Sequence, residues 1–170
     1  MTQSMTWGNY KFLAGIAGFV IVLDQATKAM VRANLALEEV WVPFPWLEPY
    51  ARIVHWKNEG ASFGFLGENN SLIIMISLAV IGAIVYYFPK ISLNDWSMRL
   101  ALALLMGGVT GNLIDRLIQG HVTDFLSIIS YNIFNLADVA NFAGVIVLLI
   151  GIVQEEWEKL KSKDKAPGNP

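Results

Sequence analysis

Four long apolar blocks, separated by polar segments, dominate the pattern of this 170-residue chain. About 20 mostly apolar residues in a helix are enough to cross the hydrocarbon core of a bilayer. The blocks have that length and few charged residues, and they cover residues 10–28, 71–88, 96–114 and 136–153. The sequence therefore predicts an all-α membrane protein with four transmembrane helices, in a single membrane domain that spans residues 1–170.

The segment between the first two blocks has a different pattern. Residues 38–46 and 52–56 mix β-branched and aromatic residues in short runs, which are typical of half-buried strands. Three prolines among them favour short strands at the edge of a sheet. The tryptophans of these runs suit the headgroup zone. We expect a small β-rich extracytoplasmic subdomain over residues 38–66, lying on the bilayer.

Four spans bring both termini to the same side of the membrane. Lys90, Arg99 and a lysine-rich tail fall on that side, which the positive-inside rule makes cytoplasmic. We expect the tail, residues 159–170, to be disordered. A cleavable signal peptide is the alternative interpretation of the first block, but the block ends at Asp24 rather than at a cleavage site of small residues.

Composition narrows the chemistry. Hydrophobic residues make up 55% of the chain and charged residues 15%, and the net charge of −2 gives no reason to expect nucleic acid as a partner. The chain has no cysteine, which excludes disulfides, thiolate metal sites and a cysteine nucleophile. It also lacks the H-E-x-x-H pattern of zinc peptidases. We expect neither a metal nor any other cofactor.

Polar residues gather at the ends of three spans. Charged groups in a membrane are costly and mark functional sites. Those at the span ends are Asp24, Asn112, Asp115, Arg116, Asn135 and Asp138. Because successive spans alternate in direction, all of them lie at the interface far from the termini. Asp124 lies in the connection between the last two spans, residues 115–135, which is short enough to bring it back over Asp138.

Two carboxylates in one partly dry site cannot both ionise cheaply, so the pair shares a proton near neutral pH. Such a pair supplies a general base and a general acid at once, as in aspartic proteases. Asp124 and Asp138 are therefore the candidate catalytic residues.

Other interpretations of the same residues stay open. Asp138 stands where a carboxylate stabilises the start of a helix, and Asp24 is one turn before Lys28 and can pair with it. A small proton-coupled transporter subunit that uses Asp24, Asp115 and Asp138 is the alternative function. A passive assembly protein is a third. Gly108 belongs to a glycine-rich stretch that favours close helix packing.

Five segments in order resemble the bacterial lipoprotein signal peptidase family, also called signal peptidase II. They are Asp24-Gln25-Ala26-Thr27-Lys28, Asn58-Glu59-Gly60-Ala61-Ser62-Phe63-Gly64, Gly108-Val109-Thr110-Gly111-Asn112-Leu113-Ile114-Asp115-Arg116, Gly120-His121-Val122-Thr123-Asp124-Phe125 and Phe134-Asn135-Leu136-Ala137-Asp138.

The resemblance implies an aspartic endopeptidase of the bacterial inner membrane, with membrane lipid around it. Its substrates would be prolipoproteins with a diacylglyceryl group on the lipobox cysteine, cut on the amino side of that cysteine. Asp124 and Asp138 would form the catalytic pair near the extracytoplasmic face. We expect the enzyme to be a monomer.

The resemblance also implies supporting roles for other residues. Those that would orient the pair or hold substrate backbone are Asn112, Arg116 and Asn135. Those that would line the outer wall of the site are Asp24, Lys28, Asn58 and Gly60. Gly108 and Asp115 belong to the same set of supporting candidates. The chain departs from the family pattern at Glu59, where threonine is usual.

Overall fold

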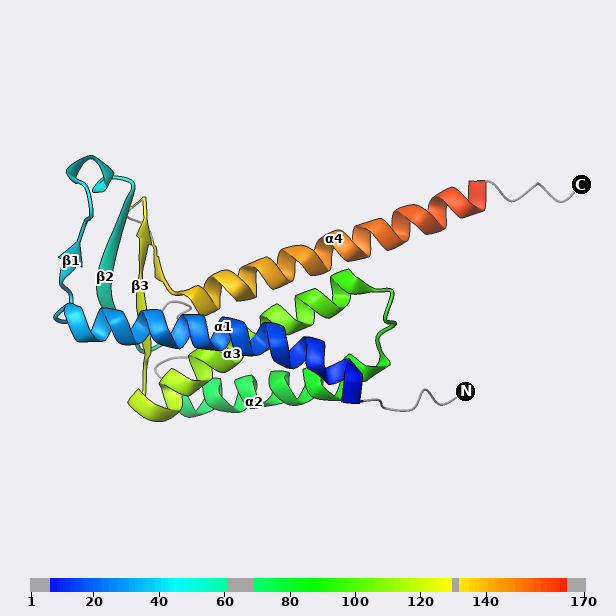
Figure 1. Ribbon diagram of the computed structural model, residues 1–170, viewed down its shortest axis with the longest axis horizontal. Helices are drawn as coiled ribbons and strands as arrows, with labels where there is room; N and C mark the ends of the chain where they lie inside the picture. The colour runs from blue at the N-terminus through cyan, green and yellow to red at the C-terminus, as the bar shows by residue number, and fades with distance from the viewer. Residues whose placement is uncertain (1–6, 61–68, 130–131, 165–170) are drawn as a thin grey trace, which may run out of the picture.

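The computed structural model describes residues 7–60, 69–129 and 132–164 of the chain. Its long helices are α1 (Trp7–Asn34), α2 (Asn70–Tyr87), α3 (Trp96–Gln119) and α4 (Leu136–Asp164). All four are long and apolar enough to cross a membrane (Figure 1). This result confirms the prediction of four transmembrane helices with a small sheet.

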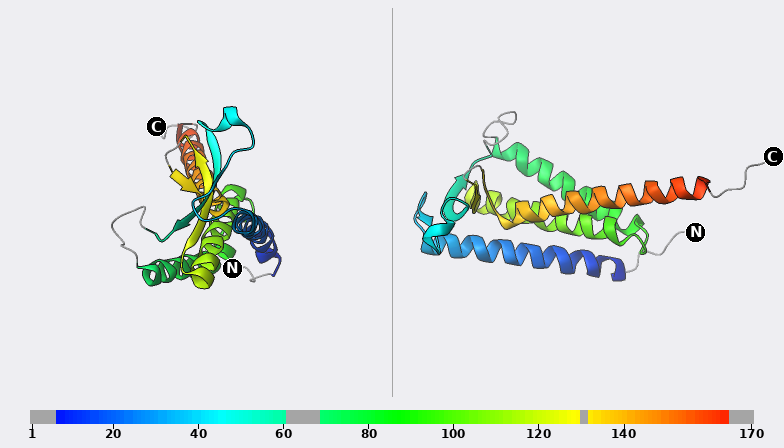
Figure 2. Two further views of the ribbon diagram at one scale, coloured as in Figure 1. Left: turned by 90° about the vertical axis from the view of Figure 1, so that its left-hand side faces the viewer. Right: turned by 90° about the horizontal axis from the view of Figure 1, so that it is seen from above.

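The helix α3 is the centre of the bundle. It packs against α1, α2 and α4, while α2 and α4 lie on different sides of it (Figures 1 and 2). At one end of the bundle, Leu13, Ile84, Phe88 and Ala103 form a buried apolar cluster. The start of α1 and the end of α4 lie at the end of the bundle away from the sheet (Figure 1). The polar ends of the spans therefore meet beside the sheet.

Two helices are longer than predicted at the sheet end. α1 continues to Asn34 rather than ending near residue 28, and α3 continues to Gln119 rather than 114. α3 ends at Gly120, whose left-handed φ of 78° favours glycine and whose N–H bonds the carbonyl of Arg116. Arg116 and its neighbour Asp115 consequently lie on the last turns of a helix, whereas we expected both just past its end.

The α4 helix also exceeds its prediction, because it reaches Asp164. The expectation of a disordered tail is therefore wrong for residues 159–164, and residues 165–170 lie outside the described part. Lys159 pairs with Glu155 at 2.8 Å and with Glu156 at 3.0 Å. Pairs at this spacing stabilise a helix that has left the apolar block.

Four strands form one antiparallel sheet in the order β1-β2-β3-β4. They are β1 (Val40–Trp41), β2 (Ala51–Asn58), β3 (Val122–Ile128) and β4 (Asn132–Phe134). The described part also has two short 3₁₀ helices, η1 (Pro45–Leu47) and η3 (Phe88–Lys90). The strand expected over 52–56 is present as β2. It lies inside the sheet, so its predicted edge position is wrong.

The other predicted strand, 38–46, is present only as the two residues of β1 at the edge of the sheet. Proline has no N–H to give to a neighbouring strand, and Pro45 instead begins η1. Residues 61–66 of the predicted subdomain lie outside the described residues. The strands β3 and β4 were not predicted at all, because residues 115–135 were expected to form a loop.

Glycines set the distances between helices. A Cβ atom at Gly107 would lie 2.6 Å from the Cβ of Val20 on α1, and one at Gly111 would lie 2.7 Å from the Oδ2 of Asp24. A Cβ at Gly108 would overlap the carbonyl oxygen of Ala137 and the side chain of Asn141 on α4. The prediction that these glycines permit close helix packing is confirmed.

We expect Gly108→Ala to lower the free energy of unfolding by about 1–3 kcal/mol, because the added methyl group would force α3 and α4 apart. Gly82→Ala is the matched control, since a Cβ at Gly82 meets nothing within 4 Å. Thermal unfolding in detergent micelles would measure both variants. Equal transition temperatures would contradict the packing role of Gly108.

Candidate active site

Asp124 lies in the middle of β3, which pairs with the neighbouring strand β2. It is 1% exposed and is opposite Trp56 in the register of the two strands. The Nδ2 of Asn58 donates to its Oδ2 at 2.8 Å, and the Nδ2 of Asn135 donates to its Oδ1 at 2.6 Å. The carboxyl group is therefore fixed by two amide side chains. The structure places it on a strand rather than in a loop.

Asp138 lies in the first turn of α4. The Nδ2 of Asn112 donates to its Oδ1 at 2.8 Å, and the backbone N–H of Asn135 donates to its Oδ2 at 3.2 Å. In return, the backbone N–H of Asp138 donates to the Oδ1 of Asn135 at 3.0 Å. This reciprocal pair is a capping arrangement. Asp138 thus has the helix-start role that its position suggested, and its carboxyl group also faces α3.

Asn135 joins the two aspartates. It is fully buried between β4 and α4. Its side-chain nitrogen binds Asp124, and its backbone N–H binds Asp138. The two acidic residues, fourteen positions apart, are therefore brought to one site by a single residue, and the expected approach of Asp124 to Asp138 is confirmed as geometry.

Burial raises the pKa of Asp124 from its ordinary value to about 6. The negative charge of Asp138 adds to this rise in pKa, while hydrogen bonds from Asn58 and Asn135 oppose it by stabilising the ionised form. At pH 7 a carboxyl group with a pKa near 6 carries a proton in about a tenth of the molecules, far more often than a carboxyl group with an ordinary pKa near 4. General acid catalysis requires such a group.

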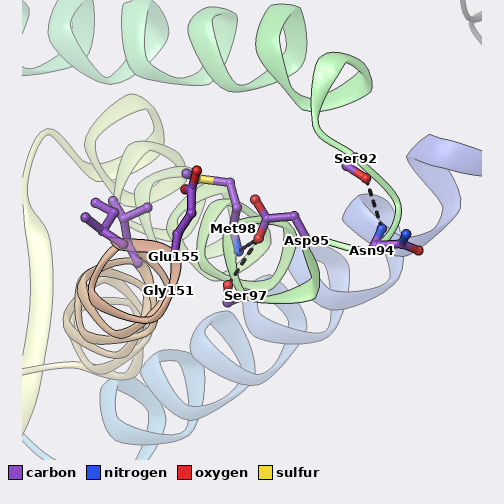
Figure 3. A pocket seen from close by; sticks show the side chains of 9 residues that line it. Ser92, Asn94, Asp95, Ser97, Met98, Gly151 and Glu155 are labelled. Atoms are coloured by element: carbon purple, nitrogen blue, oxygen red, sulfur yellow. Dashed lines mark hydrogen bonds between the residues drawn. The ribbon is translucent and has the colours of Figure 1, made fainter. Parts of the chain in front are cut away.

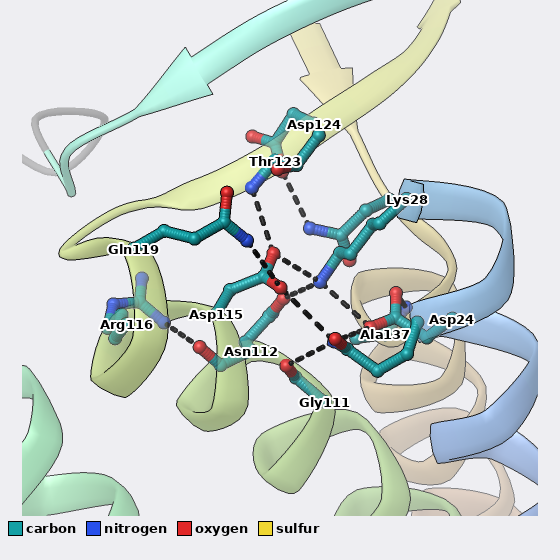
Figure 4. Close-up of polar contacts among 12 residues, drawn as sticks. Asp24, Lys28, Gly111, Asn112, Asp115, Arg116, Gln119, Thr123, Asp124 and Ala137 are labelled. Carbon is teal, nitrogen blue, oxygen red and sulfur yellow. Dashed lines mark hydrogen bonds and ion pairs between the residues drawn. The ribbon is translucent and has the colours of Figure 1, made fainter. Parts of the chain in front are cut away.

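A buried lysine, Lys28, lies among the polar side chains near Asp124 (Figure 4). The Nζ of Lys28 is 2.8 Å from Asp24, 3.2 Å from Asp115 and 2.9 Å from the Oδ1 of Asn112. Lys28, Asp24 and Asp115 are each 0% exposed. Each donor position of the ammonium group therefore has an acceptor, as a charge at this depth requires.

The two acidic partners of Lys28 also bind backbone. Asp24 accepts the N–H of Ala137 on α4 at 2.9 Å, and Asp115 accepts the N–H of Thr123 on β3 at 3.0 Å. The Lys28 cluster, defined as Lys28, Asp24 and Asp115, thus ties together α1, α3, β3 and α4. Asp24 pairs with Lys28, as the sequence allowed. With both carboxylates engaged in this way, the contacts disfavour a proton relay through Asp24 and Asp115.

Two further contacts fix the amide groups that face the aspartates. The Oδ1 of Asn112 is held by Lys28, so its Nδ2 points to Asp138. The Oδ1 of Asn58 accepts the N–H of Gly60 at 2.8 Å, so its Nδ2 points to Asp124. Gly60 has a φ of 94°, a left-handed conformation that favours glycine. Each aspartate therefore accepts a hydrogen bond from an amide side chain, and a second contact to the oxygen of that amide fixes its orientation.

The remaining predicted site residues lie around this core. Arg116 is half-buried, and its Nη1 lies 3.4 Å from the carbonyl oxygen of Asn112. Gly108 lies deeper in the bundle, against α4. Glu59 pairs with Lys57 at 2.6 Å, and both side chains are largely exposed. The departure from the family pattern at Glu59 therefore adds an exposed ion pair, in which Lys57 compensates the charge of Glu59. Residues 61–64 of the same motif lie outside the described part.

Sequence reasoning missed Gln25, Arg32 and Thr123, which also belong to the network. Gln25 donates to Asp24, to Asp115 and to the carbonyl of Gly111. Arg32 approaches Asp115 at 3.8 Å and donates to the hydroxyl of Thr123 at 3.0 Å. The spacing of Arg32 was visible, since it follows Lys28 by one helical turn, but the predicted end of the first span at residue 28 hid it. Gln25 and Thr123 carry no charge that could have marked them.

Two hollows among the described residues are lined by other residues than the aspartates. One of about 580 Å³ lies between α1 and the sheet and includes Phe125. Because successive strand residues face opposite sides, this hollow is behind β3 from Asp124. The other, of about 320 Å³, lies where α3 begins against α4 (Figure 3). Its Asp95 caps α3 by accepting the N–H of Met98. Within the described ranges no three acidic or histidine side chains could hold a metal ion.

Comparisons with known proteins agree along most of the chain. A family model described as signal peptidase (SPase) II matches residues 16–154. A lipoprotein signal peptidase of Halalkalibacterium halodurans is 37% identical over 153 residues, which cover 88% of this chain and 96% of the relative. One of Staphylococcus carnosus is 34% identical, over 85% of this chain and 89% of the relative.

Solved structures give the same picture of the fold. One bacterial membrane enzyme superposes with a TM-score of 0.78 at 28% identity and covers 93% of each chain. A second superposes with a TM-score of 0.74 at 30% identity, over 82% of this chain and 91% of the other.

Proposed function

The chain belongs to the signal peptidase II family, and from this premise we propose that it removes signal peptides from prolipoproteins with Asp124 and Asp138 as an aspartic pair. Family membership makes it a membrane peptidase. The observation that carries the aspartic mechanism is Asn135, which binds both carboxyl groups. A pair held by one residue is suited to sharing a proton.

The chemistry follows from that shared proton. The ionised carboxyl group takes a proton from a water molecule, whose oxygen attacks the scissile carbonyl carbon. The protonated carboxyl group donates to the carbonyl oxygen. The carboxyl group that took the proton from water then gives it to the leaving nitrogen as the C–N bond breaks, and the other carboxyl group takes back its proton as the carbonyl of the new carboxylic acid forms. The raised pKa of Asp124 supports it as the member that carries the proton at the start. No covalent intermediate is needed.

The supporting residues act on the pair by position and charge. Asn112 and Asn58 hold the two carboxyl groups through their amide donors. Lys28 acts on the aspartate pair through Asn112, whose Oδ1 it binds. Its ion pair with Asp115 also fixes the position of α1 relative to α3. Arg116 is half-buried on α3. Its guanidinium group is suited to binding the substrate backbone or the negative charge that develops on the carbonyl oxygen.

The substrate would be a prolipoprotein with a diacylglyceryl group on its lipobox cysteine, cut on the amino side of that cysteine. Its signal peptide is a membrane helix, so the scissile bond lies at the depth where the spans end. The aspartates are at that depth, beside the sheet. Exposed Trp41, Trp46 and Trp56 on the β1–β2 region support a surface in the headgroup zone.

The proposed location is the bacterial inner membrane, with both termini in the cytoplasm, the site near the extracytoplasmic face, and membrane lipid around a monomer. Lys90 and Lys159 support this orientation, because they lie toward the end of the bundle away from the sheet.

The function is tested by incubating the purified protein with a diacylated prolipoprotein and identifying the products by mass spectrometry. We expect a cut directly before the modified cysteine, and no cut in the same precursor without its lipid. A protein that leaves the lipidated precursor whole, or that drives proton flux into liposomes without substrate, would refute the proposal.

We expect Asn58→Ala to move the alkaline limit of activity to higher pH. The hydrogen bond from Asn58 stabilises the ionised form of Asp124 and lowers its pKa, so its loss raises the pKa above about 6. The pair then keeps its proton to a higher pH, by up to about one pH unit. Normalised pH–rate profiles measure the shift. Glu59→Gln, a change at an exposed neighbour, should leave the limit in place.

A further inference from the structure

One buried polar side chain near the aspartates, that of Asn141, has no hydrogen-bond partner among the described residues. Asn141 lies on α4, one turn deeper in the bundle than Asp138. Its Oδ1 is buried and accepts no hydrogen bond from any described residue. Its Nδ2 donates to no described residue either, and Nδ2 is not among the buried unpaired atoms. The amide therefore keeps an accessible donor at a depth where unpaired donors are costly.

The position of Asn141 follows the contacts of the active site. On α3, Asn112 binds Asp138, and one turn deeper Gly108 faces Asn141. Without a Cβ at Gly108, the Asn141 amide lies directly against the α3 backbone. The pairs Asn112–Asp138 and Gly108–Asn141 are thus successive contacts along the same two helices. Asn141 is about 4.5 Å below Asp138 along the α4 axis.

The chemistry of a membrane-helical substrate matches this donor. The last four carbonyl groups of any helix have no N–H partner within that helix. A signal peptide that enters the active site in extended form must end its helix just before the scissile bond. Its unpaired carbonyls then lie slightly deeper than the aspartates, in an environment that offers no water.

We propose that Asn141 is a substrate-binding residue, whose Nδ2 donates to a main-chain carbonyl near the end of the signal-peptide helix. This inference rests on the proposed function. It adds a contact that selects for a peptide whose helix ends at this depth. Arg116 and Asn112 face the reacting bond from α3, and Asn141 holds the approaching chain from α4.

Asn141→Leu tests the inference, because leucine has a similar size but no donor. We expect KM for a diacylated prolipoprotein to rise about 3- to 10-fold, the effect of one lost hydrogen bond, with kcat unchanged. The transition temperature of the free protein should stay equal or rise, since the substitution removes a buried acceptor without a partner. Phe142→Leu, on the lipid-facing side with 70% exposure, is the matched control and should change neither value.

The outcomes separate the inference from the proposed function. A purely structural Asn141 would give Asn141→Leu a lower transition temperature with an unchanged KM, and that result would overturn the inference. An unchanged KM at an unchanged transition temperature would also overturn it. If Asn141→Leu does not fold, Asn141→Ala gives the same comparison. Cleavage that persists in Asp138→Asn would instead refute the proposed function itself.

Discussion

Asn in place of either aspartate is expected to lower the rate of prolipoprotein cleavage by about 10²- to 10⁴-fold, the range for loss of a general acid or base. An amide can neither take a proton from water nor give one to the leaving nitrogen. Because Asp124 and Asp138 work as a pair, the double variant should be little slower than either single one. Cleavage of a diacylated prolipoprotein, followed over time, measures the three rates.

The two variants should remain folded, with a modest loss of stability. In Asp138→Asn one of the two oxygens that accept from Asn112 and Asn135 becomes a donor, so one hydrogen bond is lost. Asn112 cannot turn its amide to compensate, because its oxygen is held by Lys28. We expect a cost of about 1–3 kcal/mol for the unpaired group.

A matched substitution controls for the change of an acid to its amide. Asp95 caps α3 through one oxygen at the other end of the bundle, and asparagine caps a helix equally well. Asp95→Asn should therefore keep both activity and stability. Near-normal cleavage by Asp124→Asn or Asp138→Asn, in protein that is folded, would end the assignment of the pair.

The spans could be predicted from the sequence because a bilayer demands an unbroken apolar block, and the four blocks are unambiguous. The level of the polar residues followed from the alternating direction of the spans. That reasoning brought Asp24, Asn112, Asn135 and Asp138 to one level, and in the structure they lie together at the sheet end of the bundle. The ends of the helices were harder to predict from the sequence. Polar residues such as Lys28 and Asp115 can continue a helix when they are paired within the protein.

The β strands on either side of Asp124 illustrate what sequence periodicity could not provide. β3 is buried at four successive residues from Val122 to Phe125, so it lacks the alternation of a half-exposed strand. It pairs with β2, which is more than sixty residues earlier in the chain, and such pairing leaves no local pattern. The orientation of the two amide side chains could not be predicted from the sequence either. The contacts to the Oδ1 atoms of Asn112 and Asn58 turn their Nδ2 atoms toward the aspartates.

Lys28→Met is expected to destabilise the protein more than either asparagine substitution in the aspartate pair. Among the described residues, Lys28 is the fully buried cation that pairs with both Asp24 and Asp115, while Arg32 reaches only Asp115, at 3.8 Å. Removing one partner of a buried ion pair costs about 3–5 kcal/mol, because the remaining charge stays buried without compensation. Thermal unfolding in detergent micelles measures the loss.

A second substitution tests whether charge, rather than side-chain shape, is responsible. Adding Asp115→Asn to Lys28→Met removes one of the two uncompensated carboxylates, so it should restore part of the lost stability. Lys57→Met is the matched control, because Lys57 forms a pair that is largely exposed, and its loss should change the transition temperature little. Activity should fall in Lys28→Met even where the protein is folded, since the amide of Asn112 becomes free to turn away from Asp138. If Lys28→Met unfolds at the same temperature as Lys57→Met, the Lys28 cluster does not hold α1, α3, β3 and α4 together, and the fixed position of Asn112 needs another cause.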